Sequence, residues 1–196
     1  MPHARLANID PAVLALATVV PRRCGFHAPL TPPFRFDSGH EEELVAAFNA
    51  FARQHPPVPV GLIQVAVIDS FLALAPTEPG PRLVEFMAEC REAFAPFRVP
   101  STLADRKARA QGATTEQPDE PPDRWDEAEV PELSQFLMRL TGPLPAAQID
   151  LFMAPLSESF AGLADDRVEL GALSLMRQND PARRFFVQAR RRLTGR

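Results

Sequence analysis

The residues best suited to acid–base chemistry and anion binding lie in one short segment near the start of the chain. This segment reads PRRCGFHAPL over residues 21–30 and is followed by Pro33-Phe34-Arg35, which places His27 between Arg23 and Arg35. An imidazole has an ordinary pKa of about 6.5, so it can take or give a proton near neutral pH. A guanidinium group offers a planar fork of N–H donors that matches phosphate or carboxylate. The segment is therefore a candidate anion-binding site.

The remaining histidines and cysteines are too scattered to form a metal site. The cysteines, Cys24 and Cys90, form no C-x-x-C pattern, and His3, His40 and His55 lie far apart along the chain. Neither spacing resembles a set of metal ligands. We therefore expect free thiols, no metal and no cofactor.

Charge and hydropathy exclude several classes of protein. The net charge of −4 gives no basis for expecting binding to duplex nucleic acid. Residues 116–132 carry eight acidic residues and one arginine, which is typical of a solvated loop. Residues 183–196 carry six arginines and no acid, so they form a solvated strand end or meet phosphates, an acidic partner or the acidic loop. No signal peptide or long apolar run occurs, so we expect no membrane contact and a cytoplasmic location.

The elements that must position these residues follow from hydrophobic periodicity and from proline. The 22 prolines argue against a bundle of long helices. Helices are predicted over residues 11–18, 41–54, 81–95 and 145–156. Strands are predicted over residues 24–36, 133–141, 167–176 and 183–192, and two more over 58–75 with a turn at Asp69-Ser70. Residues 100–131 are predicted to be an acidic, Pro-rich loop, with a short helix at 102–110 left open.

The order of these elements predicts an α+β fold. Each half of the chain runs strand, helix, strand, strand, which suggests antiparallel sheets with helices packed outside them. We expect a single two-lobed domain over residues 1–196, with lobe one at about 19–99 and lobe two at about 132–196. Residues 100–131 would join the lobes.

The segment around His27 resembles the first motif of the two-histidine (2H) phosphoesterase-like superfamily. The resemblance is narrower to an uncharacterised branch whose genes often lie among those for phosphonate breakdown, and which typically reads R-Y-G-F-H-A-T-L-x-x-P-F-R. Further similarity lies at Asp10-Pro11, residues 71–76, Pro96-Phe97-Arg98 and Leu140-Thr141-Gly142. The resemblance implies a pseudo-twofold, two-lobed fold. It also implies a phosphodiesterase mechanism in which two histidines act as base and acid and two hydroxyls hold the phosphate.

The chain departs from that pattern at the residues that would carry the chemistry. His27 is retained, but Pro29 replaces the first hydroxyl-bearing residue. In the second motif, Leu137 stands where the family has its second histidine, and Arg139 stands where it has its second threonine. One histidine cannot be base and acid at opposite ends of a single displacement, and the loss of one such group typically reduces the rate by about 10²–10⁴-fold. The resemblance thus implies an impaired enzyme, with Arg139, Arg35 and Arg23 as anion-binding residues.

Three functional hypotheses follow. In the first, the protein is a pseudoenzyme that binds a phosphorylated small molecule, a nucleotide or a protein partner. In the second, it is still a phosphodiesterase, acting on cyclic phosphodiesters with His27 as base and Arg139 as charge stabiliser. In the third, it is an interaction module that forms a homodimer or pairs with a partner through a strand edge, which is exposed because the family's usual first strand is missing.

Overall fold

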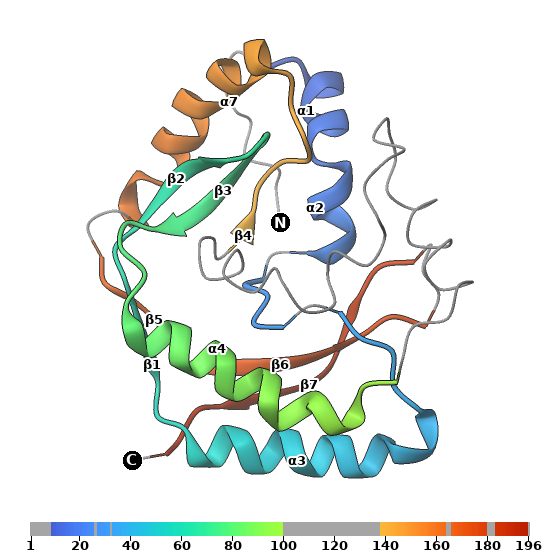
Figure 1. The fold of residues 1–196 in the computed structure, drawn as a ribbon. Helices are drawn as coiled ribbons and strands as arrows, with labels where there is room; N and C mark the ends of the chain where they lie inside the picture. Colours follow the sequence, from blue (N-terminus) through green and yellow to red (C-terminus); the bar gives the residue numbers. More distant parts are fainter. Residues whose placement is uncertain are drawn as a thin grey trace. The chain divides into compact units, whose positions relative to one another are not determined.

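The computed structural model of the protein describes residues 9–25, 27–31, 33–99, 138–163, 166–179 and 183–195 (Figure 1). These residues fold into two units, and each unit is assembled from three separate stretches of the chain. Unit 1 contains the described residues of Met1–Ala28, Pro59–Gly80 and Gln135–Glu169, and unit 2 contains those of Pro29–Val58, Pro81–Ser134 and Leu170–Arg196. The lobes expected from the sequence follow chain order, whereas both units in the structure draw on both halves of the chain.

Unit 1 is built around a three-stranded antiparallel sheet in the order β2–β3–β4. These strands are β2 (Ile63–Ile68), β3 (Phe71–Pro76) and β4 (Met138–Arg139). The two-residue turn Asp69-Ser70 joins β2 to β3, as predicted, and Asp69 adopts the left-handed conformation with φ 50°. All six residues of the central strand β3 are buried; β2 and β4 pair with its two edges, and α7 packs against it.

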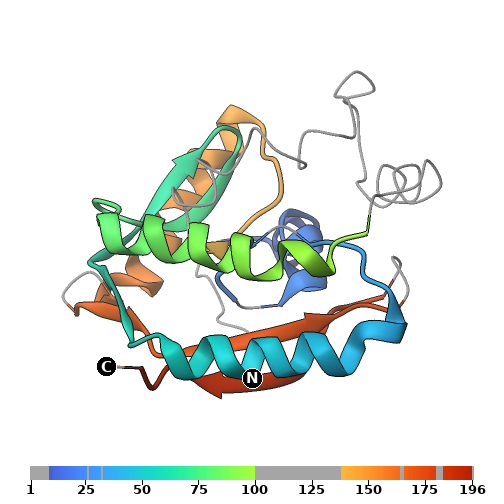
Figure 2. The same ribbon diagram turned by 60° about the horizontal axis from the view of Figure 1, so that its bottom comes forward.

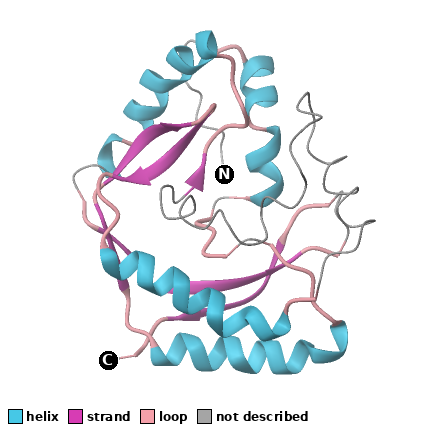
Figure 3. Ribbon diagram, in the orientation of Figure 1, coloured by secondary structure: helices cyan, strands magenta, loops and turns pink. Residues whose placement is uncertain are grey.

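Helix α7 (Ala146–Ser159) packs against β2 and β3, and α1 (Pro11–Ala17) and α2 (Val19–Cys24) precede the sheet in the chain (Figure 3). The Asp10 carboxylate caps α1 by accepting a hydrogen bond of 2.7 Å from the Ala12 N–H, as expected for a helix with Pro11 in its first turn. The buried core of this unit consists of Ile9, Ala17, Leu72, Leu144, Phe152 and Leu156.

Unit 2 is built around the antiparallel hairpin of β6 (Ala172–Arg177) and β7 (Phe186–Arg192), which confirms the predicted closing hairpin. Helix α3 (Glu41–Gln54) packs against both strands and against α4 (Pro81–Phe94), as Figure 2 shows. Short 3-10 turns η1 (Ser38–His40) and η2 (Ala95–Phe97) flank the helices. The apolar stripes predicted for the two helices are mostly buried: Leu44, Phe48, Phe51 and Ala52 on α3, and Leu83, Met87, Cys90 and Phe94 on α4.

Two predicted strand regions are divided in the structure. Residues 58–75 form three strands, because β1 (Val58–Gly61) ends at a glycine with φ 93° before β2 begins. Residues 167–176 form two strands, β5 (Val168–Leu170) and β6, separated by Gly171. Strands β1 and β5 then pair with each other in a small two-stranded sheet. The turn η3 (Ala161–Leu163) follows α7.

The prediction of an edge strand over residues 24–36 is wrong. Helix α2 extends to Cys24, and the described residues that follow contribute only an isolated antiparallel bridge between Arg35 and Val99. The physical reason is the proline content, since Pro29 and Pro33 have no N–H with which to continue a ladder. The helix predicted at 11–18 is confirmed as α1, with Thr18 as its C-cap, and α2 is a further helix that was not predicted.

The α+β fold class, with antiparallel sheets flanked by helices, is confirmed. The helix predicted for 145–156 extends to Ser159, past an internal proline, Pro155. Of the strand predicted for 133–141, the described part contributes Met138–Arg139 to β4. The acidic loop at 100–131 and the short helix at 102–110 lie outside the described residues. Within the described ranges, no helix is both long enough and apolar enough to cross a bilayer.

Residues after β7 donate backbone hydrogen bonds to the C-terminal end of α3. The Thr194 and Gly195 N–H groups donate to the carbonyls of Ala52 and His55, at 3.1 and 2.9 Å. These carbonyls lie at the helix end, where an α-helix lacks donors of its own. Gly195 is required here, because a Cβ at this position would collide with the backbone carbonyl of Gln54.

Candidate functional site

Arg139 is the predicted anion-binding residue that the structure places most firmly. It lies on β4 in unit 1 and pairs with Ala73 of the central strand β3. Its guanidinium carbon is 3.7 Å from the centroid of the Phe71 ring, and Phe71 is buried. A cation stacked on an aromatic ring is attracted by the negative face of the ring, and stacking leaves the N–H donors around the rim of the guanidinium plane. The sheet therefore holds this guanidinium group in a defined orientation.

The Leu140-Thr141-Gly142 segment fixes the end of β4. Thr141 is only 1% exposed, and its hydroxyl accepts a 3.0 Å hydrogen bond from the Leu72 N–H. The Leu72 carbonyl in turn accepts from the N–H groups of Leu140 and Thr141, and Gly142 donates to the carbonyl of Ala17 at 2.7 Å. The position of Arg139 thus depends on a buried polar junction directly after it.

Sequence reasoning treated Thr141 only as part of a family resemblance and missed its role as a positioning residue. Thr141 is the one fully buried polar residue in the described part of the chain. The available signal was a threonine followed by Gly-Pro at the end of an apolar strand. A threonine buried at such a position needs a hydrogen-bond partner for its hydroxyl, and so it can fix the end of the strand. Its partner, Leu72, lies 69 residues earlier, so the sequence could not name it.

His27, the predicted acid–base group, also belongs to unit 1. It lies in the irregular segment after α2, partly exposed, with Nδ1 3.2 Å from the carbonyl oxygen of Gly25. Gly25 has φ 77°, a conformation that favours glycine. A carbonyl oxygen can only accept, so Nδ1 carries the hydrogen, and Nε2 of the neutral ring is then an acceptor. This is the tautomer that a base acting through Nε2 requires.

The other predicted site residues are placed differently. Arg35 belongs to unit 2, where it is exposed and forms the backbone bridge to Val99. Arg23 lies in α2, but its side chain is outside the described part of the structure, and so is Leu137. His27 and Arg139 therefore share unit 1, and Arg35 does not. Pro29 offers neither a hydroxyl nor an N–H group.

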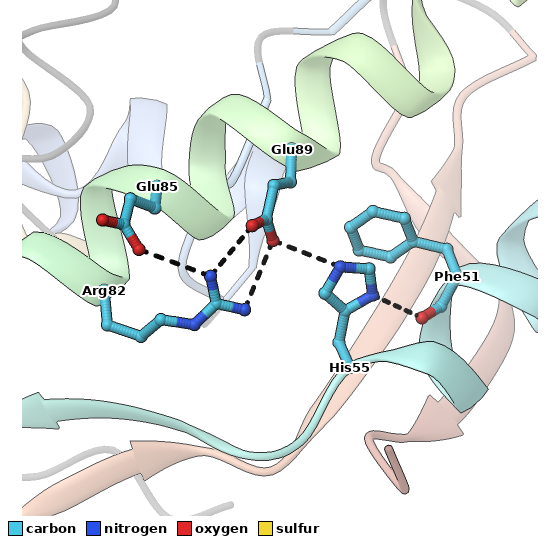
Figure 4. Close-up of polar contacts among 5 residues, drawn as sticks. All are labelled: Phe51, His55, Arg82, Glu85 and Glu89. Carbon is cyan, nitrogen blue, oxygen red and sulfur yellow. Dashed lines mark hydrogen bonds and ion pairs between the residues drawn. The ribbon is translucent and has the colours of Figure 1, made fainter. Parts of the chain in front are cut away.

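A second cluster of charged residues, in unit 2, was not expected from the sequence (Figure 4). His55 follows α3, and its Nδ1 lies 2.7 Å from the Phe51 carbonyl, while its Nε2 lies 3.1 Å from the Glu89 carboxylate on α4. The imidazole stacks on the Phe51 ring at 3.9 Å and meets the edge of Phe86. Both ring nitrogens are thus engaged, so His55 is a clamp between two helices and not a free base.

The Glu89 carboxylate is the centre of this cluster. Arg82 donates to it from both terminal nitrogens, at 2.9 and 3.3 Å, and lies 3.6 Å from Glu85. The hydrogen bonds from Arg82, and then the charges of Arg82 and His55, hold the pKa of Glu89 below its ordinary value. The same bonds raise the pKa of Arg82. Among the described residues, no group of three or more His, Cys, Asp or Glu side chains is placed to hold a metal ion.

Comparison with known proteins gives the family. The model described as "Protein of unknown function (DUF1045)" matches residues 29–186, which is more than half of the chain. The chain belongs to this family. Among curated proteins, ribose 1,5-bisphosphate phosphokinase PhnN of Janthinobacterium sp. (strain Marseille) is 26% identical over 198 residues, covering 98% of this chain and 44% of that protein. The chain thus spans less than half the length of this relative. No solved structure matches it.

Proposed function

We propose that this member of the DUF1045 family binds a phosphorylated small molecule through unit 1, with Arg139 as the main anion-binding residue and His27 as a second contact. The observation that carries this proposal is the Arg139 guanidinium, stacked at 3.7 Å on the buried Phe71 ring. A guanidinium group held in one orientation loses little freedom on binding a phosphate, which favours affinity. The resemblance to 2H phosphoesterases also supports Arg139 as the phosphate contact, because the family has a phosphate-holding threonine at the position of Arg139.

The ligand class that fits best is a phosphorylated ribose, in a pathway of phosphonate metabolism. Support comes from the family resemblance and from the relative named ribose 1,5-bisphosphate phosphokinase PhnN. We do not extend the kinase activity to this chain. Its sequence contains no P-loop, the phosphate-binding segment G-x-x-x-x-G-K-[ST]. The lysine of a P-loop follows a glycine, whereas the single lysine of this chain, Lys107, follows an arginine. We infer that the similarity concerns a part of the relative that recognises the same ligand.

Catalysis of the two-histidine type is expected to be weak or lost, because Leu137 and Pro29 replace two groups that the mechanism needs. One observation keeps the phosphodiesterase alternative open. The Nδ1 contact of His27 with Gly25 leaves Nε2 as an acceptor, the form that a general base requires. In that alternative Arg139 would stabilise the charge that develops on the phosphate.

Calorimetric titration with ribose 1,5-bisphosphate, ribose 5-phosphate and ribose tests the binding proposal. We expect both phosphates to bind and ribose not to bind. Replacement of Arg139 by Gln should weaken binding at least about tenfold, since a hydrogen bond to a charged group contributes about 1.5–3 kcal/mol. Arg190→Gln is the matched control, because Arg190 is exposed on β7 in unit 2. Equal affinities in the wild type and Arg139→Gln would overturn the proposal.

A turnover assay separates the two functions. Purified protein is incubated with a panel of 2′,3′-cyclic nucleotides, beside His27→Ala and Arg139→Gln. The binding function predicts no turnover above background in any of the three proteins. Turnover that is lost in both variants would instead establish the phosphodiesterase alternative, with His27 as base.

A further inference from the structure

Two identical tripeptides meet in unit 2. Pro33-Phe34-Arg35 precedes η1, and Pro96-Phe97-Arg98 closes η2 after α4. The Val99 N–H donates to the Arg35 carbonyl at 2.8 Å, which joins the two segments as an isolated antiparallel bridge. In Figure 1 the segment leading into α3 passes the end of α4 at this point. Neither tripeptide has a role in the function proposed above.

The two arginines have different surroundings. Arg35 is exposed, whereas Arg98 is partly buried, with its guanidinium carbon 5.5 Å from the centroid of the Phe34 ring. Nε and Nη2 of Arg98 are both completely buried, and neither has a hydrogen-bond partner. Within the described residues Arg98 forms no ion pair. A buried charged donor without an acceptor is unfavourable, so such a group calls for an explanation.

A nearby arginine in the same unit shows the usual arrangement. Arg177 lies 5.7 Å from the centroid of the Phe36 ring, so it resembles Arg98 in its aromatic contact. Its Nη1 donates to the Glu41 carboxylate at 2.8 Å, and its Nε donates to the side chain of Asn179 at 2.8 Å. Arg177 is therefore neutralised from within the chain, and Arg98 is not.

The two orphan donors of Arg98 lie on the same edge of the guanidinium plane. Nε–H and one Nη2–H point in nearly the same direction, and this edge binds two oxygens of a carboxylate or phosphate side by side. An oxyanion at this edge would satisfy both buried donors and neutralise the charge with one ligand. The Phe34 ring would hold the guanidinium plane in place.

We propose that Arg98 and Phe34 form an anion-binding site in unit 2 that accepts one oxyanion, a phosphate or a carboxylate group, on the Nε/Nη2 edge of Arg98. This site shares no residue with the Arg139 site of unit 1. It rests on the geometry of Arg98 and stands whether or not a phosphorylated ribose binds at Arg139.

The arginine Nε–H resonances of ¹⁵N-labelled protein give a direct test. A buried Nε–H exchanges slowly with water, so the Arg98 resonance should be observable, and it is assigned by its absence in Arg98→Lys. We expect inorganic phosphate, acetate or both to shift this resonance saturably, while sodium chloride at equal ionic strength leaves it in place. The ligand that shifts it at the lower concentration identifies the class of oxyanion.

Matched variants distinguish binding at Arg98 from binding at another arginine. Arg35→Lys changes the exposed arginine of the twin tripeptide and should leave the titration unchanged, and so should Arg139→Gln. An Arg98 resonance that neither anion moves, or that chloride moves equally, would overturn the proposal. If Arg98→Lys does not fold, through-bond correlation assigns the resonance, and the wild-type titration decides alone.

Discussion

At the scale of single residues, His55 has an acceptor facing each ring nitrogen. The Phe51 carbonyl and the Glu89 carboxylate face Nδ1 and Nε2, and neither can donate. The imidazole therefore joins the end of α3 to the middle of α4 through both of its ring nitrogens.

Glu89 links His55 to Arg82, and its replacement by Gln should destabilise unit 2 modestly. The carboxylate side chain is 39% exposed, so we expect a loss of about 1 kcal/mol or less in the free energy of unfolding at pH 7. Urea denaturation measures this loss. Glu85→Gln is the matched control one turn earlier on α4, because Glu85 meets only Arg82, at 3.6 Å. An equal loss in both variants would contradict a special role for Glu89.

The same carboxylate predicts a pH dependence. The pKa of Glu89 is lower in the folded state than its ordinary value of 4.5, so the folded state binds fewer protons in that range. The stabilisation that Glu89 provides is therefore complete at a pH well above its ordinary pKa of 4.5. It is lost as the pH falls through the lower pKa of the folded state. The stability difference between the wild type and Glu89→Gln should shrink as the pH is lowered from 6 toward 3. A difference that grows on acidification would contradict this.

Cys90 should be inert in the folded protein. Burial, and then the charge of Glu89, raises the pKa of its thiol to about 12. The nucleophile is the thiolate, so at pH 8 alkylation should be about 1,000-fold slower than for a thiol with an ordinary pKa near 8.5. Iodoacetamide labelling of Cys24→Ser, followed by mass spectrometry, isolates Cys90. Reaction in 6 M urea is the control, and fast labelling without urea would contradict the prediction.

At the scale of elements, the Thr141 hydroxyl helps to fix the end of β4, beside the backbone hydrogen bonds of that segment. Thr141→Val keeps the shape of the side chain but leaves the buried Leu72 N–H without an acceptor. We expect a loss of about 1–3 kcal/mol in the free energy of unfolding, measured in urea. Thr141→Ser restores the acceptor and is the matched control, so it should lose less than Thr141→Val. The reverse order would show that the methyl group, and not the hydrogen bond, holds β4.

Elements whose limits are set by neighbouring residues could be predicted from the sequence. The bounds of α3 match the prediction, because three glutamates mark its start and His55-Pro56-Pro57 marks its end. The turn at Asp69-Ser70 was also predicted, because these two polar residues interrupt the apolar run of 58–75. The division of residues 58–75 into three strands was not, because β1 leaves the hairpin to pair with β5, more than 100 residues later.

The candidate sites also differ in how far the sequence reaches. His27 and Arg139 were predicted from their positions in a motif, and both lie in unit 1; their roles stay predictions. The clamp of His55 and Glu89 was missed, because it joins the end of α3 to the middle of α4 across 34 residues. The unpartnered edge of Arg98 depends on burial, which no local pattern reports.

At the scale of the whole molecule, neither unit is a continuous piece of chain. The chain passes from one unit to the other after residues 28, 58, 80, 134 and 169. A homodimer formed through a strand edge stays a prediction at this scale. Because the units interleave, any cut in the middle of the chain removes parts of both units.

A fragment ending at residue 99 should not fold. It lacks β4 and α7 of unit 1 and the β6–β7 hairpin of unit 2, so the core residues Leu72 and Phe48 lose partners in both units. Circular dichroism and urea titration should show no cooperative transition for residues 1–99. The full chain in the same buffer is the control. A cooperative transition in the fragment would show that the first half folds independently, contrary to the interleaving of the two units.

The hydrogen bonds from Thr194 and Gly195 to the end of α3 also set an order of events during synthesis. Helix α3 leaves the ribosome long before residues 186–195, which supply its neighbouring strand and complete its last turn. At about 5–20 residues per second, the interval is roughly 10 s. Once α4 has been made, Phe51 has the rings of Phe86 and Phe94 as partners, but α3 still lacks β7. The apolar stripe of α3 therefore stays without its β7 partner until the last residues of the chain have been made.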